Sequence, residues 1–411
     1  MKKLFFILFI LIVANSVSNA CTVAVISGKY TKDGRPLLWK NRDTWALNNK
    51  IMYFNDSTYK YMGLVNSQDY SGKSIWIGMN EKGFAIMNSN SYNLTLGDTA
   101  KHSGLEGRLM KYALANFATV EEFQQYLDNM EKPTGLEGNF GVIDGQGGAA
   151  LFELGFRGYE KFDANDPKVA PFGYVLRGNY SFTGSYGDES SGYIRYHTVD
   201  DLFYQASATN NLDAQFVIQD VTRGLKHSLL KTDLYEQYRN IPENTPTYTF
   251  FHDFIPRKST ASACVVQGVM NGENPEFVTL WSVVGFPLTS IVVPTWLKAE
   301  DDFPEVIKMN EELDDSPLCN AALSLKEEVF TIRWGKFASL YYININALVN
   351  ADKTGIRQKI KPDEDIIFSK TNEKLEDWYN NGMDKTDVIE FNKWLNNFIQ
   401  KSYKKNFNID L

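Results

Sequence analysis

Hydrophobic and polar residues alternate along the first part of the chain in a pattern that predicts β-strands. The segment CTVAVISG (residues 21–28) alternates, and PLLWKNRD (residues 36–43) follows after a turn that contains Asp33 and Gly34. An Asp-Gly pair between two such runs is typical of a β-hairpin. Two more strands are predicted in residues 74–91, and three short ones in residues 139–162.

Helical patterns separate these groups of strands. Residues 105–117 have helical spacing, and a second helix is predicted to begin at Thr119, because Thr119 and Glu122 form a capping-box pattern. Residues 248–296 again favour strands. The chain ends in helices, and the last one has one apolar face, formed by Val388, Phe391, Trp394, Leu395 and Phe398. Blocks of strands between pairs of helices predict a layered α+β fold.

The N-terminal segment has a different pattern. A basic start is followed by an unbroken apolar run over residues 4–13, and the small residues Ser18 and Ala20 precede Cys21. These features predict a secretory signal peptide over residues 1–20, cut before Cys21. The apolar run is shorter than the roughly 20 residues that a membrane-spanning helix needs. We expect an exported protein, periplasmic or secreted, without a membrane span. A lipoprotein acylated on Cys21 is the alternative, although such signals normally have Leu where Ser18 stands.

Composition restricts the partners and the domain organisation. The chain is 43% hydrophobic and 14% aromatic, with a formal net charge of −8. Nucleic acids and anionic membranes attract clustered Lys and Arg, so this acidic chain gives no reason to expect either as a partner. No linker or repeat marks a boundary. Residues 21–411 are therefore predicted to form a single domain with a C-terminal helical extension over about 355–411, and whether it forms a homo-oligomer stays open.

The cysteine and histidine contents limit the chemistry. An exported chain with three cysteines has at least one thiol that is unpaired within a monomer. Cys264 and Cys319 could pair, which would leave Cys21 free. The sequence predicts no cofactor and no metal site, because the four histidines occur singly and without metal-ligand spacing; they are His102, His197, His227 and His252.

Removal of the signal peptide would place a thiol and a free α-amine on the same residue, Cys21. An unperturbed α-amine has a pKa of about 7.7 to 8.0, so part of it is an available base at neutral pH. An ordinary thiol, with a pKa of about 8.5, can give its proton to that base. Nucleophile and base are then supplied by one residue, without a histidine.

The N-terminal half resembles the Cys-type N-terminal nucleophile hydrolases. The resemblance begins at CTVAVISGKYTKDGRPLLWKNRD, continues through GMNEKGFAIMNSNSYNL, ALANFATVEEFQQYL, NFGVIDGQGGAALFEL and VLRGNYSF, and fades after about Tyr196. The group includes choloylglycine hydrolases, penicillin V acylases, acid ceramidase-like amidases and related acyltransferases. The resemblance implies a four-layer αββα sandwich and hydrolysis of a linear, non-peptide amide of a small N-acyl substrate through a thioester. An acyltransferase of the same family, or a ligand-binding lipoprotein, is the alternative function.

The resemblance also implies roles for residues near the N-terminus. Cys21 matches the nucleophile, and Asp43 matches the aspartate that orients its α-amine. The family often has Arg three residues before that aspartate, where a cation favours the thiolate. Lys40 stands at this position and Arg42 lies two residues further on. Lysine keeps the charge but not the planar fork of arginine, so this departure leaves the acyl group open.

Further roles follow for residues that would stabilise the negatively charged oxygen formed during attack on the amide. Asn90 matches a donor through its backbone N–H, with Asn88 as a competing choice, and Asn179 matches a donor through its side-chain amide. The resemblance also matches Arg195, in SGYIRY, to an arginine that braces the site. The alternative for both asparagines is a role in turns, which asparagine also favours.

Overall fold

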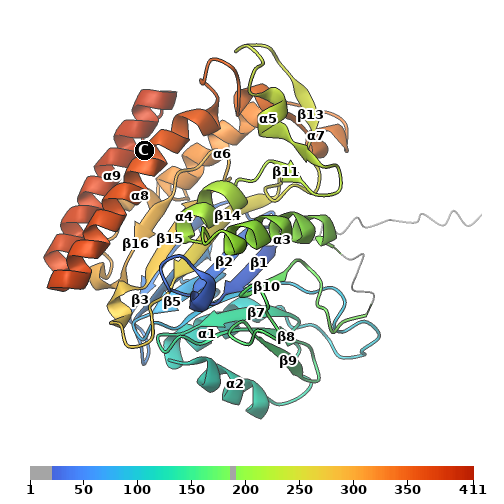
Figure 1. Ribbon diagram of the computed structural model, residues 1–411, viewed down its shortest axis with the longest axis vertical. Coiled ribbons are helices and arrows are strands. Elements are labelled where there is room, and N and C mark those ends of the chain that lie inside the picture. The colour runs from blue at the N-terminus through green and yellow to red at the C-terminus, as the bar shows by residue number, and fades with distance from the viewer. Residues whose placement is uncertain (1–20, 186–190) are drawn as a thin grey trace, which may run out of the picture.

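The computed structural model describes residues 21–185 and 191–411. The predicted signal peptide lies outside the described residues. Mixed helices and antiparallel sheets form the fold, as the sequence predicts, and every strand pair in both main sheets is antiparallel. Figure 1 shows the two sheets in the middle of the molecule, with helices on either side of them.

The first main sheet has seven strands in sequential order, so each strand is hydrogen-bonded to the next one along the chain. In spatial order its strands are β3 (Asn49–Phe54), β4 (Tyr61–Asn66), β5 (Ile77–Asn80), β6 (Ala85–Ser89), β7 (Gly138–Ile143), β8 (Ala149–Leu154) and β9 (Tyr159–Asp163).

The second main sheet has six strands and brings distant parts of the chain together. In spatial order its strands are β10 (Tyr174–Arg177), β1 (Thr22–Ile26), β2 (Leu37–Asp43), β14 (Thr260–Gln267), β15 (Thr279–Val284) and β16 (Val293–Thr295). The predicted hairpin of β1 and β2 is confirmed, and Gly34 has a φ of 78°, a conformation that favours glycine. Its connection is longer than a two-residue turn, since it includes the 3₁₀ helix η1 (Gly28–Tyr30).

The two sheets pack face to face, and the alternation of side chains along β6 shows how. Ala85 and Met87 belong to the large core cluster that also contains residues of β1 and β2, whereas Ile86 points to the opposite side. There it packs with apolar side chains of α1 (Glu106–Asn116) and α2 (Val120–Asn129). One strand thus contributes to two apolar layers, because successive side chains point to opposite faces.

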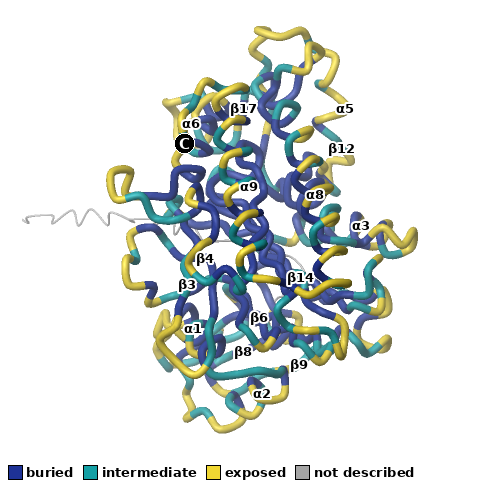
Figure 2. The backbone as a smooth tube through the Cα atoms, turned by 90° about the vertical axis from the view of Figure 1, so that its left-hand side faces the viewer, coloured by how far each residue is buried: buried dark blue, intermediate teal, exposed yellow. Residues whose placement is uncertain are grey.

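Helices also cover the outer face of the six-stranded sheet. They are α3 (Tyr193–Ala208), α6 (Pro317–Val329), α8 (Ile356–Asn381) and α9 (Lys385–Phe407). Trp281 of β15 stacks on Phe368 of α8 with ring centroids 4.6 Å apart, and Trp296 contacts Trp378 at 5.1 Å. Full burial of a large apolar side chain contributes about 1.5 to 3 kcal/mol. The long C-terminal helices are therefore an integral part of the packing (Figure 2).

Smaller elements connect these layers. They are the two-stranded ribbons β11 (Lys226–His227) with β12 (Thr232–Asp233) and β13 (Tyr248–Phe250) with β17 (Tyr342–Asn344), the short helices α4 (Ala214–Phe216), α5 (Leu234–Tyr238) and α7 (Ala338–Tyr341), the π-helical turn η3 (Val217–Val221), and the 3₁₀ helices η4 (Pro275–Phe277), η5 (Leu297–Ala299), η6 (Glu305–Ile307) and η7 (Ile345–Ala347).

Most of the locally predicted elements are confirmed. Thr119 caps α2 by accepting a hydrogen bond from the backbone N–H of Glu122 at 3.1 Å. The carboxylate of Glu122 accepts a hydrogen bond from the backbone N–H of Ala118. In a standard capping box it would bond the N–H of the capping residue itself, Thr119. In residues 21–185 and 191–411, every helix is too short or too polar to cross a bilayer.

Candidate active site

The hairpin of β1 and β2 brings Cys21 close to two basic side chains. Cys21 directly precedes β1 and is 7% exposed. In the antiparallel register Val23 lies opposite Lys40, and side chains alternate along each strand, so Cys21, Lys40 and Arg42 share one face of the sheet. This face points toward the seven-stranded sheet, because Lys40 contacts β6 through Asn88.

Lys40 is buried and held by neutral acceptors. Its Nζ donates to the backbone oxygen of Trp76 at 3.0 Å and to Oδ1 of Asn88 at 2.7 Å. Burial lowers the pKa of Lys40 to about 8, since a charged amine is poorly solvated there, and the thiol of Cys21 partly opposes this shift. Asn88, the competing choice for an oxyanion donor, therefore positions Lys40. Its Nδ2 has no hydrogen-bond partner among the described residues.

Arg42 is also buried and is held by neutral oxygens. Its Nη1 donates to Oδ1 of Asn49 at 2.7 Å, its Nη2 donates to Oδ1 of Asn66 at 2.8 Å, and its guanidinium lies 4.7 Å from the ring centroid of Trp76. Burial lowers the pKa of Arg42 to about 10, and the thiol of Cys21 again opposes the shift. In the described part of the chain neither Lys40 nor Arg42 forms a salt bridge with a carboxylate.

Asp43 lies at the centre of a buried charged cluster. Its Oδ2 accepts hydrogen bonds from Nη1 of Arg195 at 3.0 Å and from Nε of Arg257 at 2.9 Å, and its Oδ1 accepts one from Thr260 at 2.5 Å. Both Asp43 and Arg195 have fully buried side chains. The predicted contact of Asp43 with the α-amine of Cys21 stays a prediction. An ionised carboxylate has about four lone-pair sites, so three donors leave capacity for it.

Arg195 connects Asp43 to both predicted oxyanion residues. Its Nη2 lies 3.4 Å from Oδ1 of Asn179, and Nδ2 of Asn179 donates to the backbone oxygen of Asn90 at 3.0 Å. Desolvation lowers the pKa of Arg195, and the nearby Arg257 adds to this effect. The structure thus brings Asp43, Arg195, Asn179 and Asn90 into one chain of polar contacts.

A buried glutamate fixes the segment that carries Asn179. Glu153 of β8 pairs with Arg177 at 2.6 Å and accepts the backbone N–H groups of Phe182 at 2.7 Å and Thr183 at 2.9 Å. Neither Glu153 nor Arg257 was expected from the sequence. Arg257 lies more than 60 residues beyond the point where the resemblance fades, and only the pairing of β14 with β2 places it beside Asp43.

The remaining cysteines and histidines do not join this cluster as ligands. Cys21, Cys264 and Cys319 are all free thiols. Cys264 lies opposite Lys40 across the sheet, and burial raises its pKa to about 12, so it is a neutral thiol at physiological pH. Among the residues that the structure describes, no group of three His, Cys, Asp or Glu side chains is arranged to hold a metal ion.

Comparison with known proteins gives structural neighbours only. No protein-family profile and no curated protein matches the chain. The solved structures similar to it include a variant of conjugated bile acid hydrolase from Clostridium perfringens, with 16% identity and a TM-score of 0.39 over 68% of this chain and 94% of that chain. A Caenorhabditis elegans ortholog of N-acylethanolamine-hydrolyzing acid amidase has 13% identity and a TM-score of 0.34 over 49% of this chain and 90% of that chain. Penicillin V acylase from Agrobacterium tumefaciens has 15% identity and a TM-score of 0.36 over 67% of this chain and 86% of that chain.

These neighbours are of the kinds that the N-terminal resemblance names. Their identities and TM-scores are low, so the likeness does not assign an activity or a substrate to this chain.

Proposed function

We propose that the chain is an exported N-terminal nucleophile amidase of the αββα type, which hydrolyses a linear, non-peptide amide of an N-acyl substrate. Cys21 is the nucleophile and acts after removal of residues 1–20. The observation that carries this proposal is the pair of buried cations, Lys40 and Arg42, which share a sheet face with Cys21 and form no salt bridge with a described carboxylate.

Buried cations of this kind favour a negative charge nearby. Each cation is costly to bury, and an uncompensated one is stabilised by any anion that forms within a few ångströms. A thiolate on Cys21 would be such an anion, because Cys21 lies on the same sheet face as Lys40 and Arg42 and its negative charge would raise the pKa of both. The arrangement therefore supports attack by sulfur. It also supports a free thiol over a lipid-modified one, because a residue that is 7% exposed leaves little space for a diacylglyceryl group.

The proposed reaction has two steps, acylation of Cys21 and hydrolysis of the resulting thioester. The α-amine of Cys21 accepts the thiol proton while Sγ attacks the carbonyl carbon, and the protonated amine then gives that proton to the leaving nitrogen as the C–N bond breaks. A water molecule attacks the resulting thioester, and its proton passes through the α-amine to Sγ as the C–S bond breaks. The products are a carboxylic acid, an amine and the original thiol.

The polar chain beyond Asp43 supports stabilisation of the oxyanion. Asn179 is held between Arg195 and the backbone oxygen of Asn90, which limits the rotation of its side-chain amide. Preorganised donors are effective because they need no reorientation as charge develops, and the loss of one such donor typically costs about 10² to 10³ in rate.

Retention of a single extra residue should test the proposed role of the α-amine. A protein that begins at Cys21 should hydrolyse N-acyl amides, whereas one that begins at Ala20 should have no measurable activity, because its Cys21 nitrogen is part of a peptide bond. Both proteins can be prepared by cleavage of a fusion partner, checked by mass spectrometry and tested on the same panel of N-acyl substrates. Equal activity of the two proteins would contradict the mechanism.

Replacement of Lys40 should shift the pH dependence of activity. In Lys40→Met the loss of a cation should disfavour the thiolate. The pH at which kcat/KM rises should therefore increase by about one pH unit. The matched control is Lys50→Met, because Lys50 is another buried lysine, bonded to the backbone oxygen of Ser67 at 2.9 Å, and Cys21 does not influence its pKa. An unshifted pH profile for Lys40→Met would show that Lys40 has only a packing role.

A further inference from the structure

A cavity lies apart from the cluster of residues around Cys21. It has a volume of about 1060 Å³ and is enclosed by the C-terminal half of α3, the turn η3 and the first turns of α8. None of the seven predicted site residues lines it. Pockets for small molecules typically have volumes of about 300 to 1,000 Å³, so this cavity can hold a ligand of substantial size.

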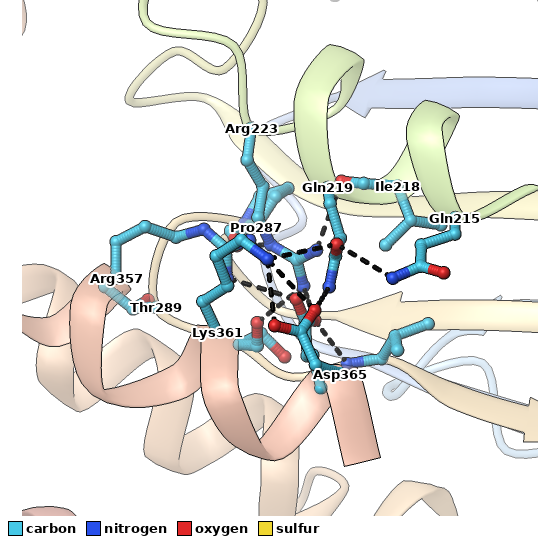
Figure 3. Close-up of polar contacts among 12 residues, drawn as sticks. Gln215, Ile218, Gln219, Arg223, Pro287, Thr289, Arg357, Lys361 and Asp365 are labelled. Carbon is cyan, nitrogen blue, oxygen red and sulfur yellow. Dashed lines mark hydrogen bonds and ion pairs between the residues drawn. The ribbon is translucent and has the colours of Figure 1, made fainter. Parts of the chain in front are cut away.

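A buried arginine, Arg223, forms the inner wall of the cavity, and most of its N–H donors are hydrogen-bonded. Arg223 donates through Nε to the backbone oxygen of Pro287 at 2.8 Å, through Nη1 to that of Ile218 at 3.1 Å, and through Nη2 to that of Ser290 at 2.9 Å. It also pairs with Glu364. Figure 3 shows Arg223 with Ile218 and Pro287, two of its partners. These contacts join η3, the loop before β16 and α8, and they make the wall rigid.

Beside Arg223 lies a second buried arginine, two of whose donor atoms have no described hydrogen-bond partner. Arg357 is 8% exposed, lines the cavity and donates through Nη1 to Oε2 of Glu364 at 3.1 Å. Its Nε and Nη2 have no hydrogen-bond partner in the described part of the chain. Arg223 and Arg357 share the single carboxylate of Glu364, so the buried group has a surplus of one positive charge.

The charges at the opening do not cancel this surplus. Lys361 pairs with Asp365 at 2.9 Å, and Asp233 accepts the backbone N–H of Tyr235 at 3.0 Å. The cavity is also lined by Lys226 and Lys353, which the carboxylates of Asp220 and Asp233 balance, so the charges at the opening sum to zero. Burial raises the pKa of Asp220, and Lys361, Arg357 and Lys226 oppose this effect.

Apolar side chains form one part of the wall; they are Leu202, Ala206, Phe216, Leu225 and Pro362. Uncharged polar side chains form another part, among them Gln205, Thr209 and Gln358. The turn η3, which contributes Gln219 to the wall, is a π-helix, and such turns are rare and frequently occur at functional sites. Apolar side chains next to converging polar groups suit a ligand that has an apolar part and a charged part.

We propose that this cavity is a second binding site, which takes an amphipathic carboxylate: the acid group binds Arg357, and a linear apolar chain lies along Leu202, Phe216 and Leu225. Guanidinium and carboxylate groups match in geometry and form charge-assisted hydrogen bonds. Among the described lining residues there is no Cys, Ser or His, so the site binds and does not catalyse by a nucleophile of these types. The acid product of the proposed reaction would be of this chemical class, but the binding does not depend on that reaction.

Dodecanoate is a suitable probe, and its binding to the chain that begins at Cys21 can be measured by isothermal titration calorimetry. A Cys21→Ala background prevents any chemistry. We expect saturable binding that weakens about tenfold or more in Arg357→Gln, because a charge-assisted hydrogen bond is lost. Dodecyltrimethylammonium, which has a similar chain and the opposite charge, should not compete. Arg157→Gln is the matched control, since Arg157 is an exposed arginine paired with Asp98, and it should bind as the parent protein does.

A second variant covers the case in which Arg357→Gln does not fold. Lys361 has a side chain that is 52% exposed at the opening of the cavity, so Lys361→Glu should fold normally and still weaken dodecanoate binding by reversing a charge. Unchanged affinity in the folded variants, or the absence of saturable binding to the parent protein, would overturn the proposal. Loss of amidase activity would not, because the measurement uses a protein that lacks the nucleophile.

Discussion

Replacement of Cys21 by alanine should lower amide hydrolysis by about 10⁴-fold or more, because the variant has no atom that can form the thioester. The α-amine stays in place and the buried cations are unchanged, so the loss would report on the sulfur alone. Cys21→Ser should keep a small residual activity, since a hydroxyl can attack but is much harder to deprotonate than a thiol. Initial rates on a panel of N-acyl amides would measure both effects.

Intact-protein mass spectrometry after rapid acid quenching gives a second measurement. The parent protein should carry the mass of one acyl group, located on Cys21, and Cys21→Ala should carry none. Cys264→Ala is the matched control, because Cys264 is a neutral, buried thiol on a neighbouring strand and its removal changes no charge near Lys40. Activity of Cys21→Ala at the level of the parent protein would disprove the mechanism, whatever the result for Cys264→Ala.

Replacement of Asp43 by asparagine should have the largest effect on stability. Asp43 accepts hydrogen bonds from two arginines, Arg195 and Arg257, and its side chain is fully buried. Without its negative charge, both guanidinium groups would lie close together without the carboxylate that bonds them, and the nearby Asp253, which contacts His252, would offset this only in part. Breaking a buried ion pair in this way typically costs about 3 to 5 kcal/mol. Urea unfolding of the parent protein and Asp43→Asn would measure the change in the free energy of unfolding.

The matched control for this substitution is Asp98→Asn. Asp98 also pairs with an arginine, Arg157, at 2.9 Å, but the side chain of Arg157 is 61% exposed. Solvent screens such a pair, so the change in unfolding free energy should be far smaller than that for Asp43→Asn. A similar, small change for both variants would mean that the charged cluster around Asp43 does not stabilise the fold.

Much of the local structure could be predicted from the sequence. The alternation in residues 21–28 and the Asp33-Gly34 turn before residues 36–43 predicted the hairpin that carries Cys21, Lys40 and Asp43. Short strand-like runs between turns predicted the strands around residues 77–89 and 139–162. The capping pattern at Thr119 identified the start of α2. These elements are predictable because they depend on local spacing and on contacts between neighbouring residues.

The order of the strands in the six-stranded sheet could not be predicted. β2 lies between β1, its neighbour in the chain, and β14, which follows more than 200 residues later. Nothing in the apolar pattern of residues 260–267 specifies a partner, because any half-buried strand could pair there. That pairing brings Arg257 and Thr260 to Asp43.

The sequence by itself determined which residues are candidates for chemistry: a cysteine behind a predicted cleavage site, and the ordered motifs that contain Asp43, Asn90 and Asn179. Only the tertiary structure decided their environment. It showed that Asn88 holds Lys40, that Arg195 joins Asp43 to Asn179, and that Arg223 and Arg357 share Glu364. Residue identity and spacing are local properties of the chain, whereas burial and the pairing of charges depend on which distant segments pack together.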